Sequence, residues 1–259
     1  MATFLFDKII FGPVKSRRLG VSLGINLLPN DCKLCSFNCI YCECGWNPKS
    51  YKEKIQLHPR DMVRERLEAK LLKMKNNNEA PDVITFAGNG EPTLHPDFGG
   101  IINDTIELRD LHFPNARIAV LSNSTMIQKE SVFNALNRVE DNILKLDGGF
   151  EATIKTIDQP MGSFNLEKTI ELLSKFKGNV TIQTLFLRGN YNGQPIDNTT
   201  EEELVAWLKH LERIQPKEVM IYTIARDTPA DNLKKVPLDE LNQIADRVKE
   251  LGFGIQVSG

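Results

Sequence analysis

VSLGINLLPNDCKLCSFNCIYCEC, residues Val21–Cys44, joins a predicted β-strand to a loop that contains all five cysteines of the 259-residue chain. The apolar and β-branched residues at its start favour a strand, and the Pro-Asn-Asp sequence that follows favours a turn. Disulfides that stabilise a fold usually join distant segments, whereas these thiols all lie within Cys32–Cys44. In a reducing compartment, clustered cysteines bind metal or carry out redox chemistry more often than they form disulfides. The loop therefore predicts a metal or redox centre at the end of the first strand.

The composition gives no dominant charge. The chain has 32 basic and 34 acidic residues, a formal net charge of -2, so it lacks the overall basic character typical of nucleic-acid-binding proteins. The N-terminal MATFLFDKII contains charged residues within a short apolar run, and no later apolar run approaches the roughly 20 residues of a membrane span. We therefore expect a cytoplasmic protein with no signal peptide and no membrane segment.

Short apolar runs alternate along the chain with longer segments of helical period. The predicted strands are Val21–Leu27, Val83–Ala87, Arg117–Ser122, Asn142–Asp147, Val180–Phe186, Val219–Ile224 and Phe253–Val257. The predicted helices cover residues 60–75, 99–111, 128–139 and 165–177, with one more that begins after Thr200 and one that begins after Pro237. At Thr200, a threonine followed three residues later by Glu203 fits a capping box.

Six successive strand–helix units imply a parallel sheet, because a crossover through a helix returns the chain in the same direction. The predicted fold class is therefore α/β, a partial (β/α)6 TIM-like barrel with parallel strands and a short extra C-terminal strand. We expect one domain over residues 1–259, with residues 1–20 as an N-terminal extension and residues 21–259 as the barrel. Functional side chains should lie where strands end, at the C-terminal mouth, and the cysteine loop follows the first strand there.

Three of the five cysteines, Cys35, Cys39 and Cys42, have the spacing C-x3-C-x2-C. One tight loop with this spacing can present three thiolates to a single iron–sulfur cluster. Such clusters are usually held by four cysteines, so three ligands leave one iron open to a substrate or cofactor.

CSFNCIYC, Cys35–Cys42, resembles the signature of the radical S-adenosylmethionine (SAM) superfamily, including the aromatic Tyr41 before the third cysteine. The resemblance implies that Cys35, Cys39 and Cys42 hold a 4Fe-4S cluster, that SAM chelates the fourth iron, and that Tyr41 lies near the adenine. It also implies that the reduced cluster cleaves SAM to a 5'-deoxyadenosyl radical, which abstracts hydrogen from a substrate. Reduced flavodoxin or ferredoxin is the implied electron donor.

A second motif, ITFAGNGEPTLHP, Ile84–Pro96, follows the second predicted strand and is similar to the glycine-rich GGEP motif of the same superfamily. Gly88, Asn89, Gly90, Glu91 and Pro92 match it, with Asn89 inserted. The resemblance implies that this backbone receives the methionine amino group of SAM. Glycines suit this role because a β-carbon would obstruct a ligand that approaches the main chain.

Candidates for further SAM contacts follow the later strands. They are Ser122, Asn123, Asp147 (with Lys145 on the same side of its strand), Gln183 and Arg188. At each position, local capping or pairing at a strand end is the alternative.

Other polar residues near the predicted mouth have open roles. Cys32 and Cys44 are too few for a second four-cysteine cluster; they could donate hydrogen, form a resolving pair, ligate iron without SAM, or simply be small residues near a metal loop. The basic run of Lys15, Arg17 and Arg18 could bind a carboxylate or phosphate of the substrate, or could face solvent.

The stretch FGPVKSRRLGVSLGINLLP, Phe11–Pro29, is similar to the segment before the cysteine loop in compact enzymes related to the radical SAM domain of the tRNA wybutosine-synthesis protein. This similarity specifies the cofactor better than the substrate, which could be a small molecule, a peptide or protein such as a glycyl radical enzyme, or RNA.

Two other classes of protein fit the sequence less well. In an electron carrier of the ferredoxin type, Cys32 would be a fourth cluster ligand, but such carriers are much smaller than this chain. A structural zinc site usually pairs two cysteine knuckles across a longer loop, which this sequence lacks.

Overall fold

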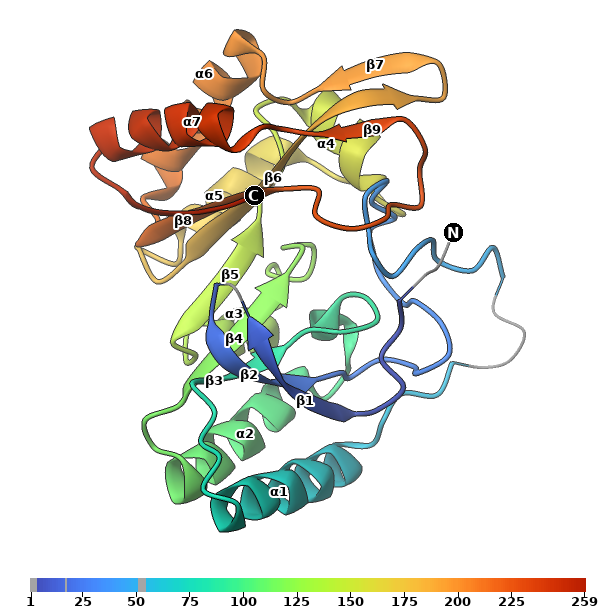
Figure 1. The fold of residues 1–259 in the computed structure, drawn as a ribbon, viewed down its shortest axis with the longest axis vertical. Coiled ribbons are helices and arrows are strands. Elements are labelled where there is room, and N and C mark those ends of the chain that lie inside the picture. The colour runs from blue at the N-terminus through green and yellow to red at the C-terminus, as the bar shows by residue number, and fades with distance from the viewer. Residues whose placement is uncertain (1–3, 17, 51–54) are drawn as a thin grey trace.

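The computed structural model describes residues 4–16, 18–50 and 55–259, so Arg17 of the basic run lies outside the described residues. The strands form one curved sheet in the order β1-β2-β3-β4-β5-β6-β8-β10, with β7 and β9 paired to β6 (Figure 1). The bounds of the strands on the main path are β1 (Ile10–Ser16), β2 (Gly20–Ile25), β3 (Val83–Phe86), β4 (Arg117–Ser122), β5 (Asp141–Lys145), β6 (Thr181–Tyr191), β8 (Glu218–Thr223) and β10 (Gly254–Ser258).

Neighbouring strands from β2 to β10 along this order run parallel. All seven predicted strands are present with small shifts at their ends, except that β6 continues five residues beyond its predicted end at Phe186 to Tyr191; β10 is the extra C-terminal strand, parallel to β8. β1 and β10 form the two edges of the main path, so the sheet is not closed. The predicted α/β class and partial barrel are therefore confirmed.

The helices follow the predicted pattern with two additions, the 3-10 helix Pro92–Leu94 and the helix Glu151–Asp158. Their bounds are α1 (Arg60–Asn76), η1 (Pro92–Leu94), α2 (Phe98–His112), α3 (Glu130–Leu136), α4 (Glu151–Asp158), α5 (Leu166–Ser174), α6 (Glu201–Ile214) and α7 (Leu238–Glu250). Of these, α4 was not predicted, because eight residues show too little of the helical period.

Three strands were also missed, and all three pair antiparallel. They are β1, whose residues are mostly exposed and include Pro13, and the short strands β7 (Gln194–Asp197) and β9 (Leu233–Lys235). The first lies within the predicted N-terminal extension and pairs with β2. An exposed or very short strand lacks the apolar run on which the prediction depended.

Alternate residues of the parallel strands face opposite sides of the sheet, as the two-residue period of a strand requires. One side packs against the helices; its strand residues include Ile84, Phe86, Ile118, Val120, Ile182 and Ile221. The opposite side faces the interior of the barrel, where a smaller buried cluster forms from Leu19, Val83, Ala119, Ile143 and Met220. The barrel interior is thus partly filled by apolar side chains.

The capping box predicted for α6 is only half formed. Thr200 Oγ1 accepts the predicted hydrogen bond from the backbone N–H of Glu203, at 3.4 Å. The Glu203 carboxylate accepts instead from Gly149 N, at 2.7 Å, and from Thr153 Oγ1. The reciprocal half of the prediction is wrong because this buried carboxylate holds the turn that leads into α4.

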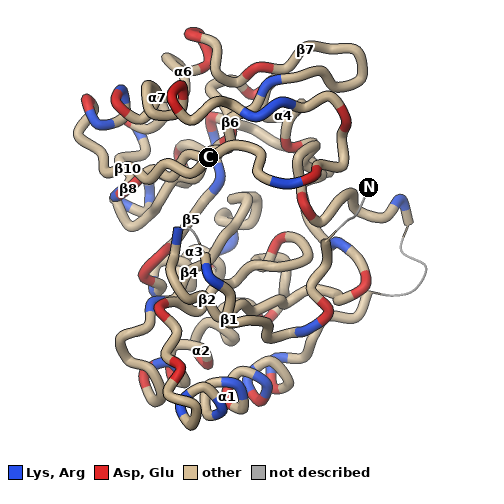
Figure 2. The backbone as a smooth tube through the Cα atoms, viewed as in Figure 1, with Lys and Arg blue, Asp and Glu red and all other residues tan. Residues whose placement is uncertain are grey.

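Basic and acidic residues are interspersed along α1 and α7 (Figure 2). Within residues 4–16, 18–50 and 55–259, none of the helices has both the length and the apolar character that a membrane crossing requires.

Candidate cofactor site

The cysteine loop follows β2 and is fixed by the side chain of Asn47. Asn47 Oδ1 accepts a hydrogen bond from Cys35 N at 2.9 Å, and Asn47 Nδ2 donates to the carbonyls of Cys35 (3.2 Å) and Phe37 (3.0 Å). Asn47 is buried. It was not a candidate because it lies outside the cysteine spacing, but its amide shapes the backbone between the first two predicted ligands.

The cysteine loop is also joined to the glycine turn after β3. Leu34 N donates to Asn89 O at 2.8 Å, and Glu91 N donates to Leu34 O at 3.0 Å. Gly90 has a φ of +138°, and a β-carbon there would lie 1.8 Å from Leu34 O. A glycine is therefore required at position 90 because the main chain of the cysteine loop occupies the place of a β-carbon.

A cavity of about 150 Å³ lies where the two loops meet. It is lined by the three predicted ligands and most of the predicted SAM contacts, namely Cys35, Cys39, Tyr41, Cys42, Gly88, Gly90, Glu91, Ser122, Asn123 and Gln183. Lys33, Phe37, Cys44, Leu121 and Lys145 complete the lining. The structure thus brings together residues from the loops or ends of β2, β3, β4 and β5 with Gln183 of β6. We call this space the cysteine cavity.

Four predicted site residues are not among the described residues that line the cysteine cavity. The buried Asn89 side chain bonds to Phe6 N and Phe6 O, at 2.8 and 2.9 Å. Pro92 is buried at the start of η1. Arg188 pairs with Glu240 at 2.5 Å, and Asp147 lies behind Tyr41, to which it is hydrogen bonded.

Glu91 and Asn123 connect the glycine turn, β4 and the cysteine loop. Asn123 N donates to Glu91 Oε2 at 2.6 Å, while Asn123 Nδ2 donates to Ser36 Oγ at 2.9 Å and contacts Cys35 Sγ at 3.5 Å. Burial raises the pKa of Glu91, and the hydrogen bonds from Asn123 N and from Thr93 counter part of that rise. These contacts fix the end of β4 against the first predicted iron ligand.

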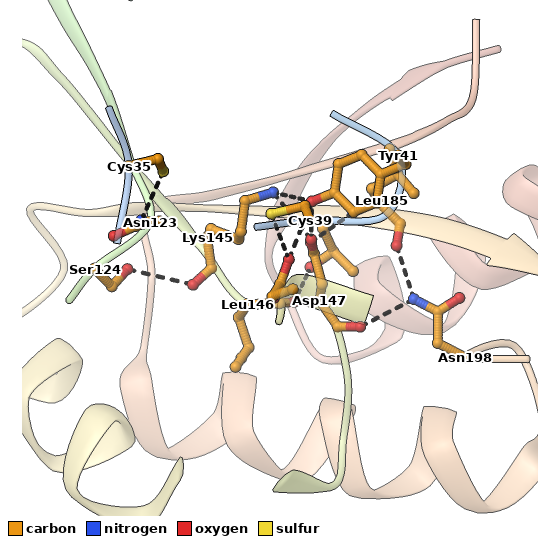
Figure 3. A network of polar contacts seen from close by, with 12 residues as sticks. Cys35, Cys39, Tyr41, Asn123, Ser124, Lys145, Leu146, Asp147, Leu185 and Asn198 are labelled. Carbon is orange, nitrogen blue, oxygen red and sulfur yellow. Dashed lines mark hydrogen bonds and ion pairs between the residues drawn. The ribbon is translucent and has the colours of Figure 1, made fainter. Parts of the chain in front are cut away.

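A buried polar network lies behind Tyr41 (Figure 3). The Tyr41 hydroxyl donates to the Asp147 carboxylate and accepts from Lys145 Nζ, which is 2.9 Å from Asp147 Oδ2. Asp158 Oδ1 accepts from Cys39 Sγ at 3.2 Å and lies 3.3 Å from the Tyr41 hydroxyl oxygen. Burial would lower the pKa of Lys145, but Asp147 raises it well above its usual value. Burial, reinforced by Asp147, raises the pKa of Asp158.

Backbone contacts hold this network in place. Asp147 Oδ1 accepts from Leu185 N at 2.8 Å, and Asn198 Nδ2 donates to the carbonyls of Asp147 (2.9 Å) and Leu185 (2.7 Å) (Figure 3). Asp158 was missed by the sequence reasoning because it ends α4, the unpredicted helix. Ile154 and Ile157, both buried and three residues apart, were the available signal for that helix.

The cysteine sulfurs have different environments. Burial raises the pKa of the Cys35 thiol to about 12. A hydrogen bond from Cys44 lowers the pKa of the Cys42 thiol to about 5, against the effect of burial. Burial would lower the pKa of the Lys33 ammonium, but negative charge on Cys42, Cys35 and Cys39 raises it overall. A buried lysine therefore lies beside the sulfurs and favours their thiolate form.

These residues fit a three-cysteine cluster site. Cys35, Cys39 and Cys42 come from one loop, line one cavity and have a cation next to them, which matches a cluster held by three thiolates with one iron open. Cys44 also lines the cavity, with Sγ 3.4 Å from Gly88 O, whereas Cys32 is not among its described lining residues. Among the residues described, no three His, Cys, Asp or Glu side chains are grouped so as to hold a single metal ion.

A larger cavity of about 520 Å³ adjoins the cysteine cavity and shares Tyr41, Cys42, Cys44, Leu121 and Gln183 with it. Its other walls come from the N-terminal segment and β1 on one side, and from β8, the segment after β8 and the end of β10 on the other. This volume is in the usual range for small-molecule sites. We call this space the barrel cavity.

The family model for the radical SAM superfamily matches residues 30–202, which include the cysteine loop and the glycine turn. The chain belongs to the radical SAM superfamily. Members of this superfamily use a 4Fe-4S cluster and SAM, so the predicted family and cofactors are confirmed.

Two curated proteins show the extent of the similarity. A Brachyspira hyodysenteriae protein named "GTPase Obg" is 32% identical over 257 residues, 98% of this chain, and the chain spans only 35% of that relative. "UPF0026 protein MJ1312" of Methanocaldococcus jannaschii is 30% identical over 244 residues, which cover 91% of this chain and 70% of the relative. The second match also places this radical SAM protein in the UPF0026 family.

Solved structures share the fold at low sequence identity. A radical SAM methyltransferase from Sphaerobacter thermophilus has a TM-score of 0.66 and 12% identity, over 92% of this chain and 65% of that one. Archaeal TYW1 has a TM-score of 0.51 and 14% identity, over 88% of this chain and 71% of that one. The radical SAM barrel is therefore common to all three proteins.

Proposed function

We propose that this protein is a radical SAM enzyme that holds the cluster on Cys35, Cys39 and Cys42 and binds SAM across the cysteine cavity. The observation that supports this most directly is the convergence of the cysteine loop with residues from or after four other strands on one cavity. When bound, the cluster and SAM supply one-electron cleavage of SAM, followed by hydrogen abstraction from a substrate.

The two adjoining cavities suggest how SAM is oriented. Glu91, Ser122 and Asn123 line only the cysteine cavity and offer polar groups to the methionine end. Tyr41 and Gln183 line both cavities, so we assign the adenosyl end to them and the substrate to the barrel cavity. The apolar side chains of Leu121 and Leu185 limit water at this boundary.

Arg188 has no place in this assignment, because it lines neither cavity within the described part of the chain. Asp147 acts on the site through Tyr41 and Lys145, and Asn89 acts through the backbone of the glycine turn. We further propose a cytoplasmic location, with reduced flavodoxin or ferredoxin as the electron donor.

Anaerobic reconstitution tests this function. We expect the wild type to bind about four irons and, once reduced, to form 5'-deoxyadenosine from SAM. Mixtures of candidate substrates should increase that yield, and deuterium transfer should identify the carbon that loses hydrogen. Changing Cys35, Cys39 and Cys42 together to alanine should abolish both iron binding and SAM cleavage.

The matched control is Cys32→Ala, a thiol removed from the same loop but outside both cavity linings, which should retain iron and SAM cleavage. The proposal fails if the triple variant keeps its iron, or if the reconstituted wild type never forms 5'-deoxyadenosine. Loss of the cluster in Cys32→Ala would instead favour a four-cysteine site.

A further inference from the structure

Arg18 places a positive charge in the wall of the barrel cavity. Its guanidinium lies over the ring of Tyr222, with Cζ 4.8 Å from the ring centroid, and its Nη1 is buried with no hydrogen-bond partner among the described residues. A buried N–H group that has lost water and gained no acceptor destabilises the protein, and the penalty is larger when the group is charged. An acceptor supplied by a ligand would remove this penalty.

The turn that carries Arg18 is held on both sides. Ser16 Oγ accepts from the backbone N–H groups of Arg18 and Leu19, at 3.3 and 3.2 Å. Leu19 is buried in the barrel interior, and its carbonyl accepts from Arg117 Nη2 at 3.4 Å. The ring of Tyr222 then supports the guanidinium by a cation–π contact. Arg18 is therefore preorganised in the folded chain.

Other charges in the wall have the same sign or are already paired. Lys15 of β1 and Arg226 after β8 also line the cavity. Glu43 is the one carboxylate among its described lining residues, and it forms an ion pair with Arg226. Lys15 and Arg18 therefore have no carboxylate partner among the described residues of this wall.

We propose that Arg18 binds an anionic group, a carboxylate or a phosphate, of the molecule that occupies the barrel cavity. The guanidinium fork suits both groups, because it can donate two parallel hydrogen bonds to either. This inference rests on the proposed radical SAM function for the identity of that molecule as the substrate. Arg18 comes just before β2, whereas the cysteine loop comes after β2, so the two lie toward opposite ends of this strand. A ligand whose anionic group binds Arg18 can therefore extend through the barrel cavity toward Cys42 and Gln183.

Calorimetric titration with two probes, inorganic pyrophosphate and succinate, tests the site on the anaerobically reconstituted protein. We expect at least one probe to bind the wild type saturably, and Arg18→Gln to weaken that binding at least about tenfold, the effect of losing a charge-assisted pair. Arg18→Lys keeps the positive charge but loses the forked guanidinium, so its affinity for the probe should lie between those of the wild type and Arg18→Gln. Arg247→Gln, at a half-buried arginine of α7 that is paired with Glu201 and lines neither described cavity, should bind like the wild type. Preference for pyrophosphate or for succinate identifies the anion as phosphate or carboxylate.

Separate measurements distinguish this site from the SAM site and from misfolding. The SAM dissociation constant of Arg18→Gln should stay within about twofold of the wild type; a tenfold loss would assign Arg18 to SAM and overturn the inference. Unchanged probe binding in a folded Arg18→Gln protein, or no saturable binding by the wild type, would also overturn it. Arg18-dependent binding in a wild type that never cleaves SAM would support the anion site while overturning the proposed function.

Discussion

The cysteine loop and the β6–β7 hairpin both extend from the ends of parallel strands, but they use their polar groups differently. In the hairpin, the Arg188 guanidinium pairs with Asp197 at 3.1 Å and with Glu240 of α7 at 2.5 Å. In the cysteine loop, backbone groups are bonded to Asn47 and to the glycine turn, while the sulfur atoms line a cavity. The hairpin uses its charged side chains in ion pairs that stabilise its own position. The cysteine loop is held through its backbone, and its side chains line the cavity.

This difference shows what identifies a site in this fold. A polar residue near a predicted strand end is not enough, since Arg188 meets that condition and lines neither cavity within the described chain. What distinguishes the cysteine loop is a backbone fixed by hydrogen bonds combined with side chains that line a cavity.

Gly90→Ala should give the largest effect, because it breaks the joint between the cysteine loop and the glycine turn. The new β-carbon would lie 1.8 Å from Leu34 O, at a φ of +138°. We expect the free energy of unfolding to fall by about 4 kcal/mol or more, with most iron lost after reconstitution. Denaturant unfolding and iron analysis measure the two effects.

The matched control is Gly193→Ala in the β6–β7 turn. Gly193 also has a positive φ, +78°, but a β-carbon there would meet no atom within 4 Å. The substitution should lower the free energy of unfolding only by the backbone strain, about 1–2 kcal/mol. The variant should keep its iron. Equal losses in both variants would remove the distinction between the two regions.

Lys145→Met should have the next largest effect, because it removes the cation from the network behind Tyr41. The Asp147 carboxylate would then lie buried beside Asp158 without its ion-pair partner. Breaking a buried pair on one side costs about 3–5 kcal/mol, which denaturant unfolding would detect. In the double variant Lys145→Met with Asp147→Asn, the free energy of unfolding should fall by less than the sum of the losses in the two single variants, because the uncompensated charge is gone. Additive losses would mean that the two side chains are not coupled.

The sequence predicted the sheet well because each parallel strand is an apolar run, and for β4 the predicted and observed bounds are the same, Arg117–Ser122. It also predicted most residues of the cysteine cavity, because the cysteine spacing and the glycine turn are local motifs that resemble those of the radical SAM superfamily. The pairing of Arg188 with Glu240, 52 residues later, depends on how the hairpin folds against α7 and is absent from any local pattern. The Nη1 of Arg18, buried and without a hydrogen-bond partner in the described part of the chain, likewise became visible only in three dimensions.

Arg188→Gln should give the smallest effect and tests the hairpin side of the comparison. Its guanidinium joins the β6–β7 hairpin to Glu240 of α7, but the side chain is 35% exposed, so solvent screens these pairs. We expect Tm to fall by no more than roughly 2–4 °C, as for a loss near 1 kcal/mol in a protein of this size. The SAM dissociation constant should not change, because Arg188 is not part of either described cavity lining. A tenfold weaker SAM affinity, with Tm unchanged, would show that the guanidinium leaves its carboxylate partners for SAM, and the hairpin would then belong to the site.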